Sequence, residues 1–323
     1  MISLILLVIS AVIGAGFATG AELVAFFGDV GLDAWAIALL VGVCLFAIMS
    51  VLIFFEGKQI RGVRWFFTAV NFATFIVMAA GLRHIAGTWA LILSLGFCVV
   101  IIFWGFSKMM WVNKYLMFFV LGILLWASLS NLTAPPQAVH TTPRIGRAIY
   151  MAILYAGLNC CILQRVLSQF SKQYSRKQIL AACGGACLII MLLVGLVLGA
   201  IMRNGVTADM PILALSNNFV TKFAVFLCIL TSMMILLNNL IPKQENSSPA
   251  FSLPLVALLL CCVAFGFSFF GFGSILGVVY PIIGGFMILY CGWLLFRGLL
   301  HLFLHNRLVV HDSVDGLQII RDE

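Results

Sequence analysis

Charged residues are scarce in this chain. Asp, Glu, Lys and Arg make up 9% of its 323 residues, whereas 64% are hydrophobic. In soluble globular domains about a quarter of the residues are charged and about half are apolar. The composition therefore excludes an ordinary soluble domain and predicts a protein with several transmembrane helices. The apolar runs are long and do not alternate with polar residues, so they do not fit the strands of a membrane barrel.

Several motifs are also missing. There is no CxxC pair, and nearly all of the ten cysteines lie inside apolar runs. We expect these cysteines to be small buried side chains rather than metal ligands or disulfides. No Ser-His-Asp order, carboxylate pair or phosphate-binding loop occurs, so we expect neither an enzyme nor a bound cofactor. The first apolar segment lacks a basic n-region and a clear cleavage site, which favours a retained span over a signal peptide.

The apolar sequence divides into ten spans of roughly 20 residues each. If the N-terminus is cytoplasmic, 13 of the 18 Lys and Arg residues fall on the inner side. This positive-inside bias predicts a plasma-membrane protein with both termini in the cytoplasm, and it explains the net charge of +8 without nucleic acid as a partner. The expected spans are 2–27, 33–55, 65–85, 88–106, 111–132, 146–166, 178–202, 219–241, 250–270 and 274–303.

Ten spans divide into two halves of five. Because five is odd, the second half is inverted relative to the first, as in inverted-repeat transporters. We therefore expect an all-α membrane domain at 1–304, with repeats at 1–145 and 146–304 and a short cytoplasmic tail at 305–323. The expected partners are the lipid bilayer and a small-molecule substrate, and the sequence identifies no protein partner.

A glycine-rich stretch interrupts the first span. It reads Ile13-Gly14-Ala15-Gly16-Phe17-Ala18-Thr19-Gly20, and its three glycines weaken a helix. In lipid a span keeps its helix unless it lines a cavity, so the stretch predicts a discontinuous helix. The amides of 16–19 would suit a substrate carboxylate, since half-helix N-termini attract anions, and a small amino acid or similar zwitterion fits this chemistry. The alternative is a glycine-rich surface for helix packing.

An inverted repeat with a broken first span predicts a matching break in span 6. The best candidate is Gly157, which lies between Tyr155 and Asn159 in an otherwise apolar run. We expect the substrate to bind between the two breaks, with Tyr155 and Asn159 in contact with it.

Glu22 directly follows the first break and is the one acid that we place deep within a span. Buried carboxylates in membranes usually face a cavity and serve in transport. Glu22 is therefore a candidate proton carrier, or a partner for a cationic group of the substrate. The structural alternative is that Thr19-x-x-Glu22 forms a capping box for the second half of the span, with the carboxylate at the positive helix end. Both roles are compatible.

The span-1 motif GAGFATG-x-E, followed by Phe26-Phe27, resembles the opening motif of the YkvI-type membrane proteins, usually written GAGFASGQE-x-x-x-FF. That family is grouped with the amino acid–polyamine–organocation superfamily, whose core is the ten-helix LeuT-type fold. The resemblance implies this fold and a transport class, but no substrate. The chain departs from the family at Ala21, where Gln is usual, and at Arg83-His84, where small residues are typical. Looser matches occur at Leu154–Asn159, Met210–Leu213, Thr231-Ser232, Val279–Pro281 and Gly284-Gly285.

The resemblance also implies a sodium site. Thr231 and Ser232 are adjacent hydroxyls in span 8, and in LeuT-type sodium-coupled transporters such a pair joins carbonyls of span 1. By that resemblance the partners in this chain are the carbonyls near Ser10 and Ile13. The alternative is that both hydroxyls bond to their own backbone or to a neighbouring helix.

The expected function is secondary transport by alternating access, with sodium or a proton as the coupling ion. The segment Asp209–Asn218 is too short to cross and would act as an outer lid. A non-transporting nutrient sensor on the same fold is the alternative. His301 and His305 share a helix face, for which we favour an interfacial role over a metal site.

Overall fold

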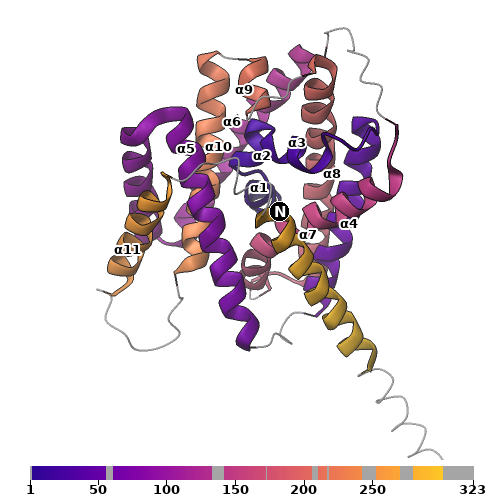
Figure 1. Cartoon of the computed structure of the whole chain (residues 1–323). Helices are drawn as coiled ribbons and strands as arrows, with labels where there is room; N and C mark the ends of the chain where they lie inside the picture. The colour runs from indigo at the N-terminus through magenta and orange to yellow at the C-terminus, as the bar shows by residue number, and fades with distance from the viewer. Residues whose placement is uncertain are drawn as a thin grey trace, which may run out of the picture.

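The computed structural model describes residues 2–55, 61–132, 142–171, 173–205, 210–216, 218–241, 252–269 and 279–300 (Figure 1). All regular secondary structure in these ranges is helical. The expected tail at 305–323, with His301 and His305, lies outside them. The helices are α1 (Ile2–Val12), α2 (Ala15–Thr19), α3 (Ala21–Phe27), α4 (Ala34–Phe54), α5 (Arg61–Phe103), α6 (Phe106–Asn131), α7 (Ile145–Phe170), α8 (Arg176–Asn204), α9 (Pro211–Leu215), α10 (Phe219–Leu240), α11 (Ser252–Phe267) and a final helix, Val279–Leu300.

The outer surface of the described helices is apolar. Within the described residues, seven helices are long and apolar enough to cross a membrane. Trp89 and Leu93 on α5 are 80% and 74% exposed, and Phe118 on α6 is 73% exposed. Soluble monomers rarely expose contiguous apolar surface on this scale, whereas lipid acyl chains are its natural solvent. The chain is therefore a multi-pass membrane protein.

The long helix α5 is two helices joined at a turn. Gly87 has a φ of 85° and a ψ of 175°, a non-helical conformation that glycine adopts without a steric penalty. Figure 1 shows the chain turning back at this end, and the second arm packs against α11. The turn falls between the expected spans 65–85 and 88–106, so this predicted boundary is confirmed.

The first expected span is broken, as predicted, and the chain is interrupted at two points. α1 ends at Val12, and Gly14 is extended, with a φ of −98° and a ψ of −165°. The short α2 ends at Gly20, whose φ of 80° favours glycine, and α3 begins at the next residue. Backbone groups beside these two glycines leave the helical hydrogen-bond pattern, so they need partners elsewhere in the protein.

The expected break in span 6 is wrong. α7 runs without interruption from Ile145 to Phe170, with Gly157 in its interior. A Cβ at Gly157 would lie 2.6 Å from the carbonyl oxygen of Gly284 in the final helix, and a Cβ at Gly284 would overlap the carbonyl of Leu154. The two helices therefore meet backbone to backbone. Gly157 serves this close packing rather than a break, a common use of glycine between membrane helices.

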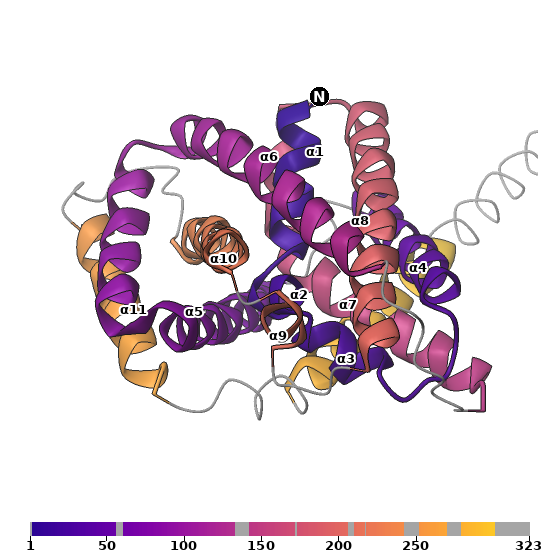
Figure 2. The same ribbon diagram turned by 90° about the horizontal axis from the view of Figure 1, so that it is seen from above.

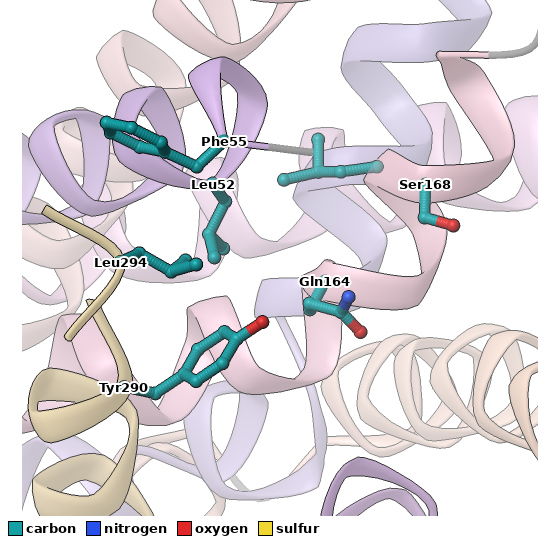
Figure 3. Close-up of a pocket in the computed structure, with 7 residues that line it drawn as sticks. Leu52, Phe55, Gln164, Ser168, Tyr290 and Leu294 are labelled. Atoms are coloured by element: carbon teal, nitrogen blue, oxygen red, sulfur yellow. The ribbon is translucent and has the colours of Figure 1, made fainter. Parts of the chain in front are cut away.

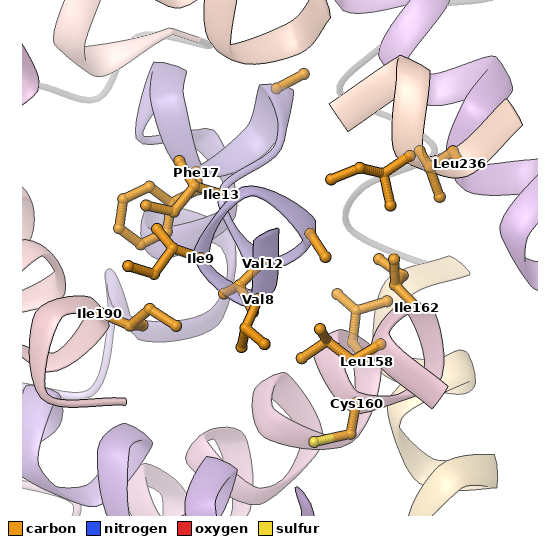
Figure 4. Packing of buried hydrophobic residues seen from close by; sticks show 14 of the residues in the cluster. Val8, Ile9, Val12, Ile13, Phe17, Leu158, Cys160, Ile162, Ile190 and Leu236 are labelled. Atoms are coloured by element: carbon orange, nitrogen blue, oxygen red, sulfur yellow. The ribbon is translucent and has the colours of Figure 1, made fainter. Parts of the chain in front are cut away.

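α10 lies at the centre of the bundle. Figure 2 views it end-on, and α5 and α6, which lie around it, are its main neighbours. A larger share of α10 is buried than of any other candidate span in the described ranges. Figure 4 shows the apolar core that holds the broken first segment in place, with contributions from Ile9, Ile13, Leu158 of α7, Ile190 of α8 and Leu236 of α10. This packing places the first interruption against α10, where the candidate site lies, and the second against α8 and α9.

The contact between Gly157 and Gly284 predicts a specific cost. Gly284→Ala should lower the free energy of unfolding by about 1–3 kcal/mol or more, because the added methyl group meets rigid backbone rather than a movable side chain. Thermal unfolding of the purified protein in detergent measures the effect. Gly292→Ala in the same helix is the matched control, since nothing lies within 4 Å of its Cβ position. Equal stability of the two variants would contradict the assigned packing.

Candidate functional site

The first interruption turns backbone carbonyls toward α10. The Ser232 hydroxyl lies 3.0 Å from the carbonyl oxygen of Ser10 and 2.9 Å from that of Ile13. The Cys228 thiol, one turn earlier on the same face of α10, donates to the Ile13 oxygen at 3.2 Å. All four residues are buried. Ser10, Ile13 and Ser232, expected to be neighbours, are therefore brought together.

The remaining hydroxyls of this region bond elsewhere. Thr231 donates to the carbonyl oxygen of Cys228 in its own helix at 2.8 Å, as the structural alternative for it supposed. The Ser10 hydroxyl donates to the Asn113 side-chain oxygen of α6 at 2.8 Å. Thr231 and Ser232 were both expected to contact the carbonyls of Ser10 and Ile13. Only the Ser232 hydroxyl does so, and Thr231 is its neighbour in α10.

Met78 occupies the space next to Gly14. Its sulfur accepts the N–H of Ala15, the first residue of α2, at 3.0 Å, and a Cβ at Gly14 would overlap its terminal methyl group. The first amides of a helix have no acceptor within that helix. Ala15 directly precedes the expected anion cradle at 16–19, and its amide is satisfied by a thioether from α5. Within the cradle, the Ala18 N–H donates to the Gly14 carbonyl oxygen at 2.9 Å.

Glu22 is buried in the first turn of α3 and folds back on α2. A Cβ at Gly16 would overlap the Glu22 side chain, so that glycine makes the room for it. The capping-box alternative is wrong: Gly20 is the N-cap of α3, and the Thr19 hydroxyl accepts the N–H of Ala21 at 3.4 Å rather than that of Glu22. Thr19 instead donates its hydroxyl to the carbonyl oxygens of Ala15 and Gly16, at 2.8 and 3.2 Å. Glu22 is therefore free of the structural role that competed with a functional one, apart from its favourable place at a helix N-terminus.

Tyr155 lies against the face of α3 that carries Glu22. The rings of Phe26 and Phe27 pack edge-on against the Tyr155 ring, with centroids 5.4 and 5.7 Å away. Asn159 donates its side-chain amide to the Tyr155 carbonyl oxygen at 2.9 Å and so bonds within α7. Tyr155 and Asn159 are both buried, Tyr155 completely.

The described part of the expected lid covers the second interruption. α9 packs against α2 and α8, and Pro211 and Ile212 are buried. A Cβ at Gly20 would lie 3.3 Å from Ile212 and 3.4 Å from Pro211. The segment therefore closes over the end of α2. Asp209 and Asn217, within the expected lid range, lie outside the described residues.

Other polar groups cluster away from the broken segment. Asn239 of α10 donates to the Asn71 side-chain oxygen of α5 at 3.2 Å. Arg83 donates to the Ser268 carbonyl oxygen at 3.3 Å and lies over the Phe269 ring, so this departure from the family pattern ties α5 to the end of α11. Figure 3 shows a small cavity between α4, α7 and the final helix, lined by Leu52, Phe55, Gln164, Leu167, Ser168, Tyr290 and Leu294.

Three contributors escaped sequence reasoning. Cys228 had a usable signal, since it precedes Ser232 by four residues and so shares its helix face. Met78 and Asn113 had none, because an apolar residue and a lone amide in long apolar spans do not indicate which helix they meet. Of the expected ion-site residues, the structure joins all but the Thr231 hydroxyl directly. Of the expected substrate residues, Gly157 faces another helix.

The comparisons with known proteins found similarity among solved structures. No family model and no curated protein matches the chain. Among solved structures the chain is similar to Mhp1, a nucleobase-cation-symport-1 family transporter, in a closed conformation with bromovinylhydantoin bound. The identity is 11% and the TM-score 0.48, over 90% of this chain and 73% of that chain. This similarity is too weak to assign a fold or a function.

The overlap between Gly16 and Glu22 predicts a dependent pair. Gly16→Ala should lower the free energy of unfolding by about 1–3 kcal/mol, because the buried Glu22 side chain has to move. In a Glu22→Ala background the same substitution should cost much less, because the atoms that it meets are gone. A double-mutant cycle in thermal unfolding isolates this interaction. Gly96→Ala, with open space at its Cβ position, is the control, and additive effects would rule out the contact.

Proposed function

We propose that this chain is a secondary transporter, in which ion binding at the first interruption drives alternating access of a small solute. The observation that carries the proposal is the contact of Ser232 with the carbonyl oxygens of both Ser10 and Ile13. Interrupted helices whose freed carbonyls coordinate ions are a recurring device of secondary transporters. A sodium ion or a proton is the proposed coupling ion.

The chemistry of the cluster favours a cation. A hydroxyl has one proton, so Ser232 fully satisfies only one of the two carbonyls at a time. The Cys228 thiol, a weak donor, is the other group directed at Ile13. Oxygen acceptors therefore outnumber strong donors. A hard cation such as sodium would satisfy both carbonyls and the hydroxyl oxygen together, with the Thr231 oxygen beside them.

The proposed solute site lies on the other side of the same segment. It comprises the turn of α2, the buried carboxylate that follows it and the facing part of α7, with α9 as the outer lid. A small amino acid or a similar zwitterion fits a site that pairs helix N-terminal amides with a carboxylate. The residues proposed to line it are Gly14, Ala15, Gly16, Phe17, Ala18, Thr19, Glu22, Tyr155 and Asn159.

We further propose the ten-crossing arrangement with two inverted halves. α1 to α3 would form one crossing, the two arms of α5 two crossings, and α11 one. The resemblance to the YkvI-type proteins supports this arrangement, while the unbroken α7 removes one of its expected symmetric features. A non-transporting sensor with the same binding site is the second candidate.

Uptake into proteoliposomes tests the function. Purified protein should take up members of a panel of small amino acids when a sodium or a proton gradient is imposed, each gradient separately and with no uptake in empty liposomes. Solute binding without uptake under either gradient would contradict transport and favour the sensor.

The ion site makes a second prediction. Sodium chloride, compared with choline chloride at equal ionic strength, should raise the free energy of unfolding of the parent protein by about 1–3 kcal/mol near saturation. The double variant Thr231→Val, Ser232→Ala should lose this effect, because two oxygen ligands are gone. Thr74→Val is the matched control, since Thr74 is buried and bonds to its own α5 backbone at Val70. A parent protein insensitive to sodium would exclude the sodium site and leave the proton as the coupling ion.

A further inference from the structure

Three buried side chains with oxygen atoms lie near one another where α3, α7 and the final helix meet. Glu22 is 3% exposed, Tyr155 is fully enclosed and Tyr280 is 1% exposed. Each of the three interacts electrostatically with the other two. We refer to Glu22, Tyr155 and Tyr280 as the acceptor cluster.

The helix packing explains why these side chains meet. Phe26 lies one turn after Glu22 on α3, and its ring packs against the Tyr155 ring, so this face of α3 looks toward α7. Tyr280 lies one turn before Gly284, which contacts the backbone of Leu154 in α7. The acceptor cluster is thus assembled from both sides of the close contact between α7 and the final helix.

Within the described residues the acceptor cluster is unsatisfied. Neither the Tyr155 nor the Tyr280 hydroxyl has a hydrogen-bond partner, and the ion pair found in the described residues, Arg147 with Asp29, does not involve Glu22. The Asn159 side-chain amide donates to the Tyr155 carbonyl oxygen at 2.9 Å and also lies near the Tyr155 hydroxyl. Buried polar groups are nearly always paired in native proteins, so two unpaired hydroxyls beside a buried carboxylate indicate a missing ligand.

We propose that the acceptor cluster binds the protonated primary amino group of the solute, an assignment that rests on the proposed solute site and names the chemical class it selects. A primary ammonium group has three N–H donors. The acceptor cluster provides a carboxylate and two phenol oxygens from three separate segments. The ligand also supplies the positive charge that the described residues do not offer to Glu22.

A proton alone does not meet the same requirement. Protonated Glu22 adds one O–H donor, and the phenols can donate to its carboxyl oxygens, but no single group then contacts all three side chains and no positive charge is supplied. A quaternary ammonium group carries the charge but has no N–H donor for the hydroxyls. The geometry therefore selects for donors and charge together, and distinguishes a primary amine from both.

Three probes of different chemistry test the assignment on the purified full chain in detergent. Isobutylammonium has a positive charge and N–H donors, and tetramethylammonium has a positive charge but no N–H donor. Isobutyrate has a negative charge and no N–H donor. Isobutylammonium should raise the unfolding temperature in a saturable way, and the other two should not. Equal stabilisation by tetramethylammonium, or none by isobutylammonium, would overturn the proposal.

Single variants then place the probe. Glu22→Gln should weaken isobutylammonium binding by about 100-fold, and Tyr155→Phe and Tyr280→Phe by about tenfold each, as expected for hydrogen bonds to a charged group. Without the probe, the two Phe variants should be as stable as the parent or more stable, because each removes an unpaired buried hydroxyl. Tyr290→Phe is the matched control, since its hydroxyl is also buried without a partner in the described chain but lines the separate cavity of Figure 3.

The outcome is separable from the test of transport. Amine binding that depends on Glu22 and Tyr280, in a protein that takes up no solute, would contradict transport and leave the acceptor cluster standing. Uptake of amino acids that is unchanged in Glu22→Gln and in Tyr280→Phe would overturn the acceptor cluster and leave transport standing.

Discussion

A helix that is interrupted inside a membrane cannot turn to lipid for hydrogen bonds, and the rest of this structure depends on that constraint. Three side chains from two helices provide the hydrogen bonds that lipid cannot. Ser232 and Cys228 of α10 reach the carbonyls before Gly14, and Met78 of α5 reaches the amide after it. The interruption is therefore held by protein groups of modest strength. A thiol and a thioether are weak hydrogen-bonding partners, so a ligand with stronger ones competes well for the same backbone atoms.

The central position of α10 follows from the same constraint. A helix that satisfies another segment's backbone has to be shielded from lipid on most sides, and α5 and α6, together with the broken first segment, provide that shield (Figure 2). The polar residues of α10 then face protein partners instead of lipid. Cys228, Ser232 and Asn239 contact the first segment, α5 and α7 along its length. One helix thus connects the interruption with the buried amides on α5.

The sequence allowed the first interruption to be predicted but not the course of span 6, and glycine is the reason for both. Three glycines in seven residues weaken a helix enough to indicate a break. A lone glycine such as Gly157 is equally consistent with a break and with a close helix contact, and Gly284, which decides between them, lies far away in the chain. The pairing of Ser232 with Ser10 and Ile13 was predictable only through a family resemblance. Met78 and the Tyr155–Tyr280 pairing depend on how the helices are oriented, which apolar spans of this kind do not encode in a readable pattern.

The glycine contact between α7 and the final helix has a mechanical consequence. A contact made by backbone atoms has no rotamers to rearrange, so the two helices resist sliding and are suited to move as one body. Tyr155 and Tyr280 ride on that body at a fixed spacing, whereas Glu22 is carried by α3, a seven-residue helix that starts at a left-handed glycine. The two phenols would therefore keep their positions relative to each other, whereas the carboxylate would move with α3 about Gly20. Binding of a group between the carboxylate and the phenols would change the backbone angles at Gly20, which lies beside α9, the helix that covers it.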